Sequence, residues 1–151
     1  MLDRLRDLLI SRTPSSENAR LDPAQVATGV LLIEAASVDE DFTEVEKRLV
    51  RRVIRERFDL DSETVEAVIA EAKAAHSESF DLWQFTHELN ESCTQAEKIA
   101  IMEDVWRVLY SDGHLGGHED HLAHKLRHLL NLSHPQFIEA KMKILREVRS
   151  Q

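Results

Sequence analysis

Apolar residues recur at intervals of three and four along most of the chain, the spacing that places them on one face of an α-helix. The clearest such segment begins at Asp22-Pro23, where Asp22 suits the N-cap and Pro23 suits the first helical position. From there to Val38, apolar side chains surround the predicted helix almost completely. Because a helix that is apolar on all sides is usually central and buried, we expect this helix to form the centre of the fold.

Residues that favour helix starts mark the other predicted helices. In two of them a Thr is followed three positions later by Glu, the pattern of a capping box. The predicted starts are Thr43 with Glu46, Asp61, Thr94 with Glu97, Gly116 or Gly117, and Ser133 with Pro135 and Gln136, with a shorter helix around Leu82–Leu89. A short amphipathic helix over residues 1–12 and a polar linker over 13–21 precede them. The pattern therefore predicts an all-α fold of seven to eight helices.

The two halves of the chain repeat the same order of features. A shift of 73 positions places Asp39 on Asp112, Asp41 on His114 and Glu46 on Glu119. An Asx-Leu-(Asp/Ser) segment follows in each half, as Asp59-Leu60-Asp61 and as Asn131-Leu132-Ser133. We therefore predict that two pseudo-repeated helix–acidic turn–helix halves form one globular domain over residues 22–151, after an N-terminal segment over 1–21.

The composition agrees with a helical protein and narrows its partners. Only 4 of the 151 residues are Gly and 3 are Pro, which favours long helices with few turns. The net charge of −9 argues against general binding to nucleic acid or to anionic lipid, because both need a cationic surface. A single cysteine, Cys93, excludes an intrachain disulfide. With no signal peptide and no apolar run long enough to span a membrane, the expected location is the cytoplasm.

The first acidic turn has the chemistry of a hard-cation site. It contains five carboxylates within eight residues and no basic residue: Asp39, Glu40, Asp41, Glu44 and Glu46. Carboxylate oxygens suit Ca²⁺ or Mg²⁺. The segment is not an EF-hand, because its sixth position is Glu44 instead of glycine and its twelfth is Val50 instead of glutamate.

The second turn offers a mixed set of ligands. Asp112, His114 and Glu119 combine oxygen and nitrogen donors, which suit Zn²⁺ or Mn²⁺ better than Ca²⁺. In both turns the acids also have a simpler explanation, because Asp and Glu at a helix N-terminus stabilise the helix dipole and cap its first turn. The sequence leaves cation binding and plain capping as alternatives.

The two turns and the segments around them resemble the TerB family of tellurite-resistance proteins, over about residues 24–148. The resemblance rests on Ser111-Asp112-Gly113-His114-Leu115 with Glu119 and Asn131-Leu132-Ser133, and on Val38-Asp39-Glu40-Asp41-Phe42 with Glu46 and Asp59-Leu60-Asp61. It implies an all-helical fold, acidic turns that bind divalent cations, and a role in stress response through protein partners. Glu40 stands where the family pattern has glycine, and His114 stands where an acidic or polar residue is commoner, which leaves the metal's identity open.

Other features permit weaker hypotheses. Five histidines lie between positions 114 and 128, and two of them, His124 and His128, are spaced to hold a transition metal on a helix surface. Glu34 lies among apolar residues, where a buried carboxylate needs a partner, and Arg107 holds the equivalent place in the second half. The basic side chains from Lys47 to Arg55 suit a phosphate or an acidic partner, or simply a solvated face.

No conventional catalytic motif is present in the sequence, so we expect a protein that is not an enzyme. The leading hypothesis is a non-enzymatic, divalent-cation-binding interaction module with a protein partner, of a TerB-like stress-response type. The alternative is a metal-free helical adaptor or co-chaperone-like domain. A remote alternative is a small metal-dependent hydrolase, since Asp39-Glu40-Asp41-Phe42-Thr43 matches the Asp-x-Asp-x-Thr string of haloacid-dehalogenase-type phosphatases. The sequence does not indicate the oligomeric state.

Overall fold

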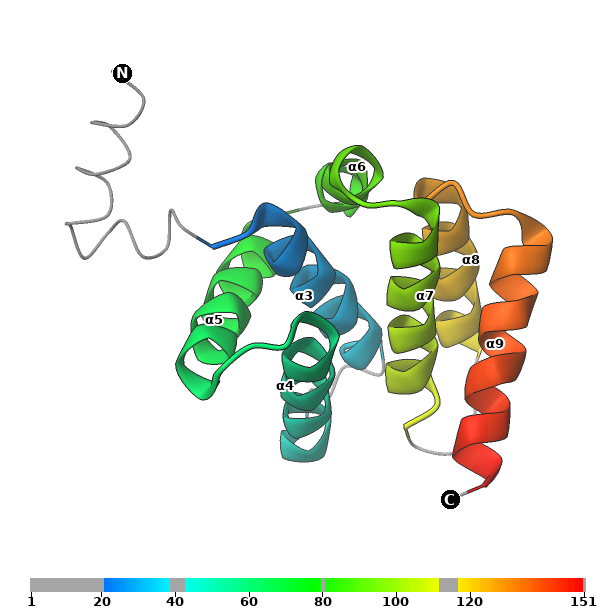
Figure 1. Cartoon of the computed structure of the whole chain (residues 1–151), viewed down its shortest axis with the longest axis horizontal. Helices are drawn as coiled ribbons and strands as arrows, with labels where there is room; N and C mark the ends of the chain where they lie inside the picture. Colours follow the sequence, from blue (N-terminus) through cyan, green and yellow to red (C-terminus); the bar gives the residue numbers. More distant parts are fainter. Residues whose placement is uncertain (1–20, 39–42, 80, 112–116, 151) are drawn as a thin grey trace.

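The computed structural model describes residues 21–38, 43–79, 81–111 and 117–150, and within these ranges it contains seven α-helices and no strand (Figure 1). The helices are α3 (Pro23–Ala36), α4 (Glu44–Phe58), α5 (Ser62–Glu78), α6 (Trp83–Ser92), α7 (Gln95–Leu109), α8 (Gly117–Leu129) and α9 (His134–Arg149). The predicted all-α class is therefore confirmed. The amphipathic helix predicted over residues 1–12 lies outside the described residues.

Helix α3 is the central element of the first half, as its apolar sequence predicts. It packs against α4, α5, α6 and α7, and ten of its fourteen residues are buried. Its start follows the predicted cap, since the backbone N–H of Ala24 donates to Asp22 Oδ1 at 2.9 Å. Thr28, although fully buried, donates its hydroxyl to the carbonyl of Ala24 at 2.8 Å, so no polar group is left unsatisfied there.

Gly29 allows α3 and α5 to approach each other closely. A Cβ atom added at Gly29 would lie 2.8 Å from the Cβ of Ala72 on α5, well inside van der Waals contact. Two small residues facing each other therefore set the distance between these two helices. Glycine is required at position 29 for a steric reason, because the atom that an added Cβ would meet belongs to a side chain of the packed helix α5.

The second half is built around α7, which packs against α8 and α9 as well as against α3. Figure 1 shows α7, α8 and α9 running side by side. Trp106 of α7 is fully buried and contacts the rings of Tyr110 and Phe137, with ring centroids 5.8 and 5.2 Å apart. This aromatic group fills the space between α7 and α9 and gives the second half its own core.

The backbone supports the repeat inferred from the sequence. Among the described residues other than glycine, only Asp59 and Asn131 have positive φ, of 52° and 56°, and they occupy matching positions in the two halves. In each half, the backbone N–H of the residue after the positive-φ residue caps the C-terminus of the preceding helix. Leu60 N–H donates to the carbonyl of Arg55, and Leu132 N–H donates to the carbonyl of Arg127. The capping boxes predicted at Thr43 and Thr94 are both present, and Ser133 forms a third with Gln136.

Within the described residues, no helix combines the length and the hydropathy needed to cross a membrane.

Replacing Gly29 with Ala is expected to lower the free energy of unfolding by about 1–2 kcal/mol, because overpacking between α3 and α5 outweighs the better helix propensity of Ala. Urea denaturation measures the change. Gly117→Ala is the matched control, since an added Cβ there meets nothing within 4 Å, and it should cost no stability. Adding Ala72→Gly to Gly29→Ala should recover part of the loss. Strictly additive effects of the two substitutions would contradict the proposed steric contact.

Candidate functional site

The predicted cation ligands fall into two groups. Asp39, Asp41, Asp112 and His114 lie outside the described residues. Glu46 and Glu119, the glutamates that follow the two turns, are described, and their surroundings differ. In the part of the chain that the structure describes, no three His, Cys, Asp or Glu side chains are grouped to hold a metal ion. Any site at either turn must therefore use the turn residues themselves.

Glu46 lies at the surface in the first turn of α4, where it completes the capping box. Its Oε1 accepts hydrogen bonds from the backbone N–H and the hydroxyl of Thr43, at 3.2 and 2.9 Å. The backbone N–H of Glu46 donates to the Thr43 hydroxyl in return, at 3.2 Å. The capping explanation is therefore correct for Glu46. Because a carboxylate has about four acceptor positions, the cap does not use all of its capacity as a ligand.

Glu119 is buried, with only 4% of its surface exposed, although it holds the equivalent place at the start of α8. Burial raises the pKa of the Tyr110 hydroxyl at the end of α7. Of the charges that act on this hydroxyl, Asp120 and Glu119 raise its pKa and Arg149 lowers it. A carboxylate held inside the protein beside the second turn provides the hard oxygen donor that divalent cations prefer. The donor types of both turns thus fit a divalent cation.

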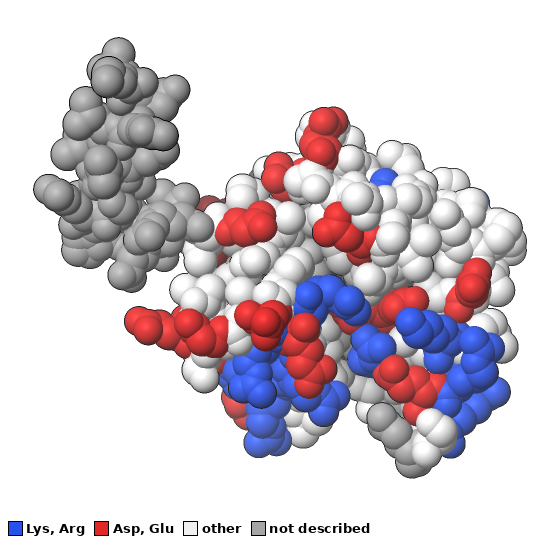
Figure 2. Space-filling model, viewed as in Figure 1, with Lys and Arg blue, Asp and Glu red and all other residues white. Residues whose placement is uncertain are grey.

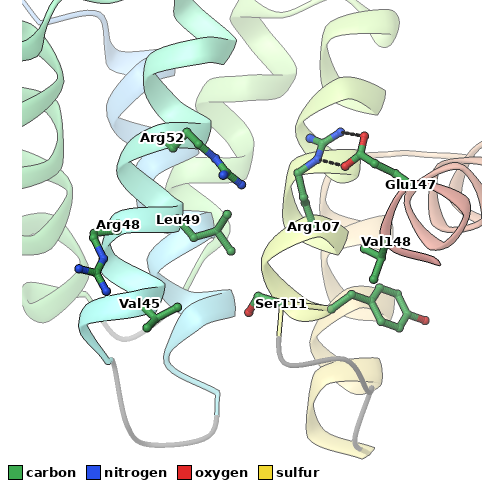
Figure 3. Close-up of a pocket in the computed structure, with 9 residues that line it drawn as sticks. Val45, Arg48, Leu49, Arg52, Arg107, Ser111, Glu147 and Val148 are labelled. Atoms are coloured by element: carbon green, nitrogen blue, oxygen red, sulfur yellow. Dashed lines mark hydrogen bonds and ion pairs between the residues drawn. The ribbon is translucent and has the colours of Figure 1, made fainter. Parts of the chain in front are cut away.

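A groove lies between the two halves, with α4 on one side and α7 and α9 on the other (Figure 3). It encloses about 430 Å³ and is called the inter-half groove below. Its lining residues are Val45, Arg48, Leu49, Arg52, Arg107, Tyr110, Ser111, Glu147 and Val148. Figure 3 shows Val45, Leu49 and Arg52 projecting from α4 toward α7 and α9. The periodicity of α4 explains this wall, because positions 45, 48, 49 and 52 share one helix face.

The inter-half groove combines apolar and cationic side chains. Val45 is 64% exposed, which is unusual for a large apolar side chain at the start of a helix. Leu49, one turn further along α4, is half-buried, and Val148 of α9 lies on the opposite wall of the groove. Arg48 and Arg52 are exposed on the same wall. Such a mixture suits a ligand that is itself both apolar and acidic.

A network of charged side chains joins α4, α7 and α9 at one end of the groove. Arg57 Nε donates to Asp104 Oδ2 at 2.7 Å, and Arg107 Nη1 donates to Asp104 Oδ1 at 2.6 Å. Arg107 also pairs with Glu147 through two hydrogen bonds of 2.6 and 2.9 Å. These residues, with Arg52, Val53 and Glu56, line a second, mostly polar hollow of about 410 Å³ that shares Arg52, Arg107 and Glu147 with the groove.

Asp104 is the buried member of this network, with 1% of its surface exposed. Burial raises the pKa of its carboxyl, although the guanidinium groups of Arg57 and Arg107 act in the opposite direction. The hydrogen bond with Asp104 raises the pKa of Arg57. The hydrogen bond from Arg107 lowers the pKa of Glu147. The hydrogen bonds from two guanidinium groups offset part of the cost of burying this charge.

Sequence reasoning did not identify this network. The available signal was an acid at position 104 within the apolar stripe of α7, between Ile101 and Val105. The sequence-based pairing of Glu34 with Arg107 is wrong. Glu34 Oε2 lies 2.6 Å from His76 Nε2 of α5, because α3 turns this side chain toward α5 and α6. Arg107 instead faces Asp104 and Glu147.

The histidines of α8 lie on its surface. His121, His124 and His128 are all exposed, as the predicted polar face requires. His124 Nε2 lies 3.6 Å from Asp120 Oδ2, and its ring contacts Phe137. His128 Nε2 is 3.4 Å from a guanidinium nitrogen of Arg127. His124 and His128 thus have different neighbours, and the described structure gives no sign of a metal site between them.

The remaining catalytic hypothesis does not fit the structure. The Asp-x-Asp-x-Thr string of dehalogenase-type phosphatases follows a buried strand of an α/β fold. Here the segment before Asp39 is the helix α3, and the described residues contain no strand.

Taken together, the repeated helix–turn–helix halves, the acidic turns and the charged groove define a small all-α protein with paired acidic turns. The family model described as tellurite resistance protein TerB matches residues 25–142. The chain therefore belongs to the TerB family, whose domain is generally a non-enzymatic helical one. Comparisons with curated proteins and with solved structures gave no match.

Asp104→Asn is expected to lower the free energy of unfolding by about 3 kcal/mol, because Arg57 and Arg107 lose the charge that compensates their partly buried guanidinium groups. Chemical denaturation at neutral pH measures the loss. Glu66→Gln is the matched control. It removes the ion pair that joins Glu66 to Arg51, and because both side chains are largely exposed it should cost less than about 1 kcal/mol. Equal effects of the two substitutions would show that the network contributes no more than a surface pair.

Proposed function

We propose that this TerB-family protein is a non-enzymatic interaction module whose partner-binding surface responds to a divalent cation. A cation held by Asp39, Asp41 and Glu46, or by Asp112, His114 and Glu119, would join the acidic turn to the first turn of the next helix. Ca²⁺ or Mg²⁺ suits the first, all-carboxylate set. Zn²⁺ or Mn²⁺ suits the second set, which includes an imidazole.

The observation that carries the proposal is how closely the two acidic segments are connected along the chain to residues that line the inter-half groove. The first turn ends directly before α4, whose second residue, Val45, lines the groove. The second turn directly follows Ser111, which lines the groove from the other half. Both acidic segments therefore connect, within one or a few residues, to the walls of the same groove. A cation held at either segment would therefore be connected, through the chain, to a wall of that groove.

Glu119 supports a role for the second turn beyond capping. A glutamate can cap the start of a helix without being buried, as Glu46 does at the start of α4. Glu119 instead is buried, and its charge is one of those that raise the pKa of Tyr110, which lines the groove. A cation bound to Glu119 would change this charge.

The competing proposal is a metal-free adaptor, in which both turns are helix caps and only the groove binds a partner. The capping box at Thr43 and Glu46 favours it for the first turn. The two proposals share a protein partner and a non-enzymatic mechanism. They differ in whether a chelator changes the protein.

After treatment with a chelator, adding one of Ca²⁺, Mg²⁺, Mn²⁺ or Zn²⁺ is expected to raise the melting temperature in a saturable manner. A ligand that binds only the folded state stabilises it by about 2.7 kcal/mol at a hundredfold excess over its Kd. Asp39→Asn and Asp112→Asn test the two turns separately, and the variant that abolishes the response locates the site. Differential scanning calorimetry provides the measurement.

Glu63→Gln is the control for these variants, since Glu63 is an exposed acid in the first turn of α5, away from both turns. It should leave the response to cations intact. If no ion raises the melting temperature of the native chain, the cation role is wrong and the metal-free adaptor remains.

A further inference from the structure

We propose that the inter-half groove binds an acidic amphipathic helix of a partner protein. The inference deepens the interaction role proposed above and rests on it for the existence of a protein partner. It adds the binding surface and the chemistry of the partner. It does not require that a cation control the groove.

The first argument is the distribution of charge. The chain carries 28 acidic and 19 basic residues, yet six of those basic residues lie on α4 alone. They are Lys47, Arg48, Arg51, Arg52, Arg55 and Arg57. Figure 2 shows Lys and Arg side chains gathered on the lower part of one face, over α4 and the end of α9, while the upper part is nearly devoid of them. An acidic protein that concentrates its cations beside a groove offers a complementary surface for an acidic ligand.

The second argument is that some of these basic side chains form no salt bridge within the described residues and can therefore bind a ligand. Arg57 is held by Asp104, and Arg51 pairs with Glu66. Arg48 and Arg52 both line the groove, and neither forms a salt bridge within the described residues. Of the two, Arg52 projects toward α7 and α9, whereas Figure 3 shows Arg48 projecting from the other side of α4. The carboxylate of Glu147 also lines the groove, and the charge of Arg52 contributes to its lowered pKa. An incoming carboxylate would gain charge-assisted hydrogen bonds from the exposed Arg52 guanidinium.

The third argument is the apolar part of the groove. Val45 and Leu49 form a ridge on α4, with Val148 on the opposite wall. Burying an apolar side chain such as Leu on this ridge removes water from both surfaces, and each fully buried side chain contributes about 1.5–3 kcal/mol. Val45 is 64% exposed in the protein alone, so this gain is still available to a partner. A purely ionic ligand would leave the ridge in water.

The shape of the surface favours a helix. The groove and the polar hollow share Arg52, Arg107 and Glu147, so together they follow α4 from Val45 to Arg57. Twelve helical steps span roughly 18 Å, which matches about three turns of a bound helix. The apolar end lies at Val45, and the polar end lies at Arg57. This order orients the partner, with its apolar residues near the start of α4 and its acids near Arg52.

A protein segment fits these features better than an anionic membrane or a nucleic acid. Both of those ligands are uniformly charged and extended, and they would meet the acidic remainder of a chain with net charge −9. A helix of about three turns touches the groove alone and can match its apolar and cationic ends separately.

The test measures binding of a panel of fluorescent, acidic amphipathic helical peptides of about 15 residues, with Leu, Ile, Phe or Trp on one face and Glu on the other. Each peptide is paired with a scrambled version of the same composition. We expect at least one panel member to bind with a Kd below about 1 mM, and its scrambled version to bind at least about tenfold more weakly. Fluorescence anisotropy with the full chain provides the readout.

Charge-reversal variants locate the binding surface. Arg52→Glu is expected to weaken binding at least about tenfold, because it replaces an attraction in the groove with a repulsion. Arg55→Glu is the matched control. It makes the same change of charge on the same helix, but Arg55 is exposed and does not line the groove, so binding should change by less than about threefold. Val45→Asp should also weaken binding, since it removes the apolar ridge.

Several outcomes would overturn the inference. They are the failure of every peptide to bind, equal losses from Arg52→Glu and Arg55→Glu, equal binding of scrambled peptides, or stronger binding to phosphatidylserine vesicles or to an oligonucleotide. The same titrations with chelator and with each divalent cation separate this inference from cation control. Groove binding that ignores the cation supports the inference and contradicts only the control by metal. A rise in melting temperature with no peptide binding contradicts only the groove.

Discussion

Helix α3 has to be covered on every side, because its sequence provides no polar face that water could solvate. The structure meets this requirement by surrounding it with α4, α5, α6 and α7. Since α7 belongs to the second half, the two halves cannot separate without exposing the central helix to water. The burial of α3 thus holds the two halves of the described chain together. It also brings α4 close to α7 and creates the seam in which the inter-half groove lies.

The seam holds a network of charged side chains from three helices. Asp104 is buried against Arg57 and Arg107, and this ionic contact links α4 to α7. Arg107 in turn holds Glu147 of α9. Three helices from two halves are therefore fixed relative to one another at the polar end of the groove. The apolar end, around Val45, lies at the start of α4 and near Ser111, which are the described residues next to the two acidic segments.

Local rules predicted the helices well and long-range pairs poorly. The capping boxes at Thr43 and Thr94, and the αL residues Asp59 and Asn131, follow from short-range hydrogen bonds and backbone preferences that a few neighbouring residues decide. The partner of Glu34 depends instead on how α3 is rotated against α5, and the sequence-based choice of Arg107 was wrong. The same limit applies to the glutamates after the turns. Glu46 and Glu119 match in sequence, but one caps a surface helix and the other is buried.

The sequence by itself determined the all-helical class, the helix starts, the central position of α3 and the resemblance that the family match bears out, because all of these rest on periodicity and on motifs read within a few residues. Only the tertiary structure decided the groove, its apolar and cationic ends, and the Arg57–Asp104–Arg107–Glu147 network. These features join residues from about 40 to 100 positions apart, and their contacts depend on the rotation and spacing of packed helices. That spacing is set by pairs such as Gly29 and Ala72, whose importance appears only when the two helices meet.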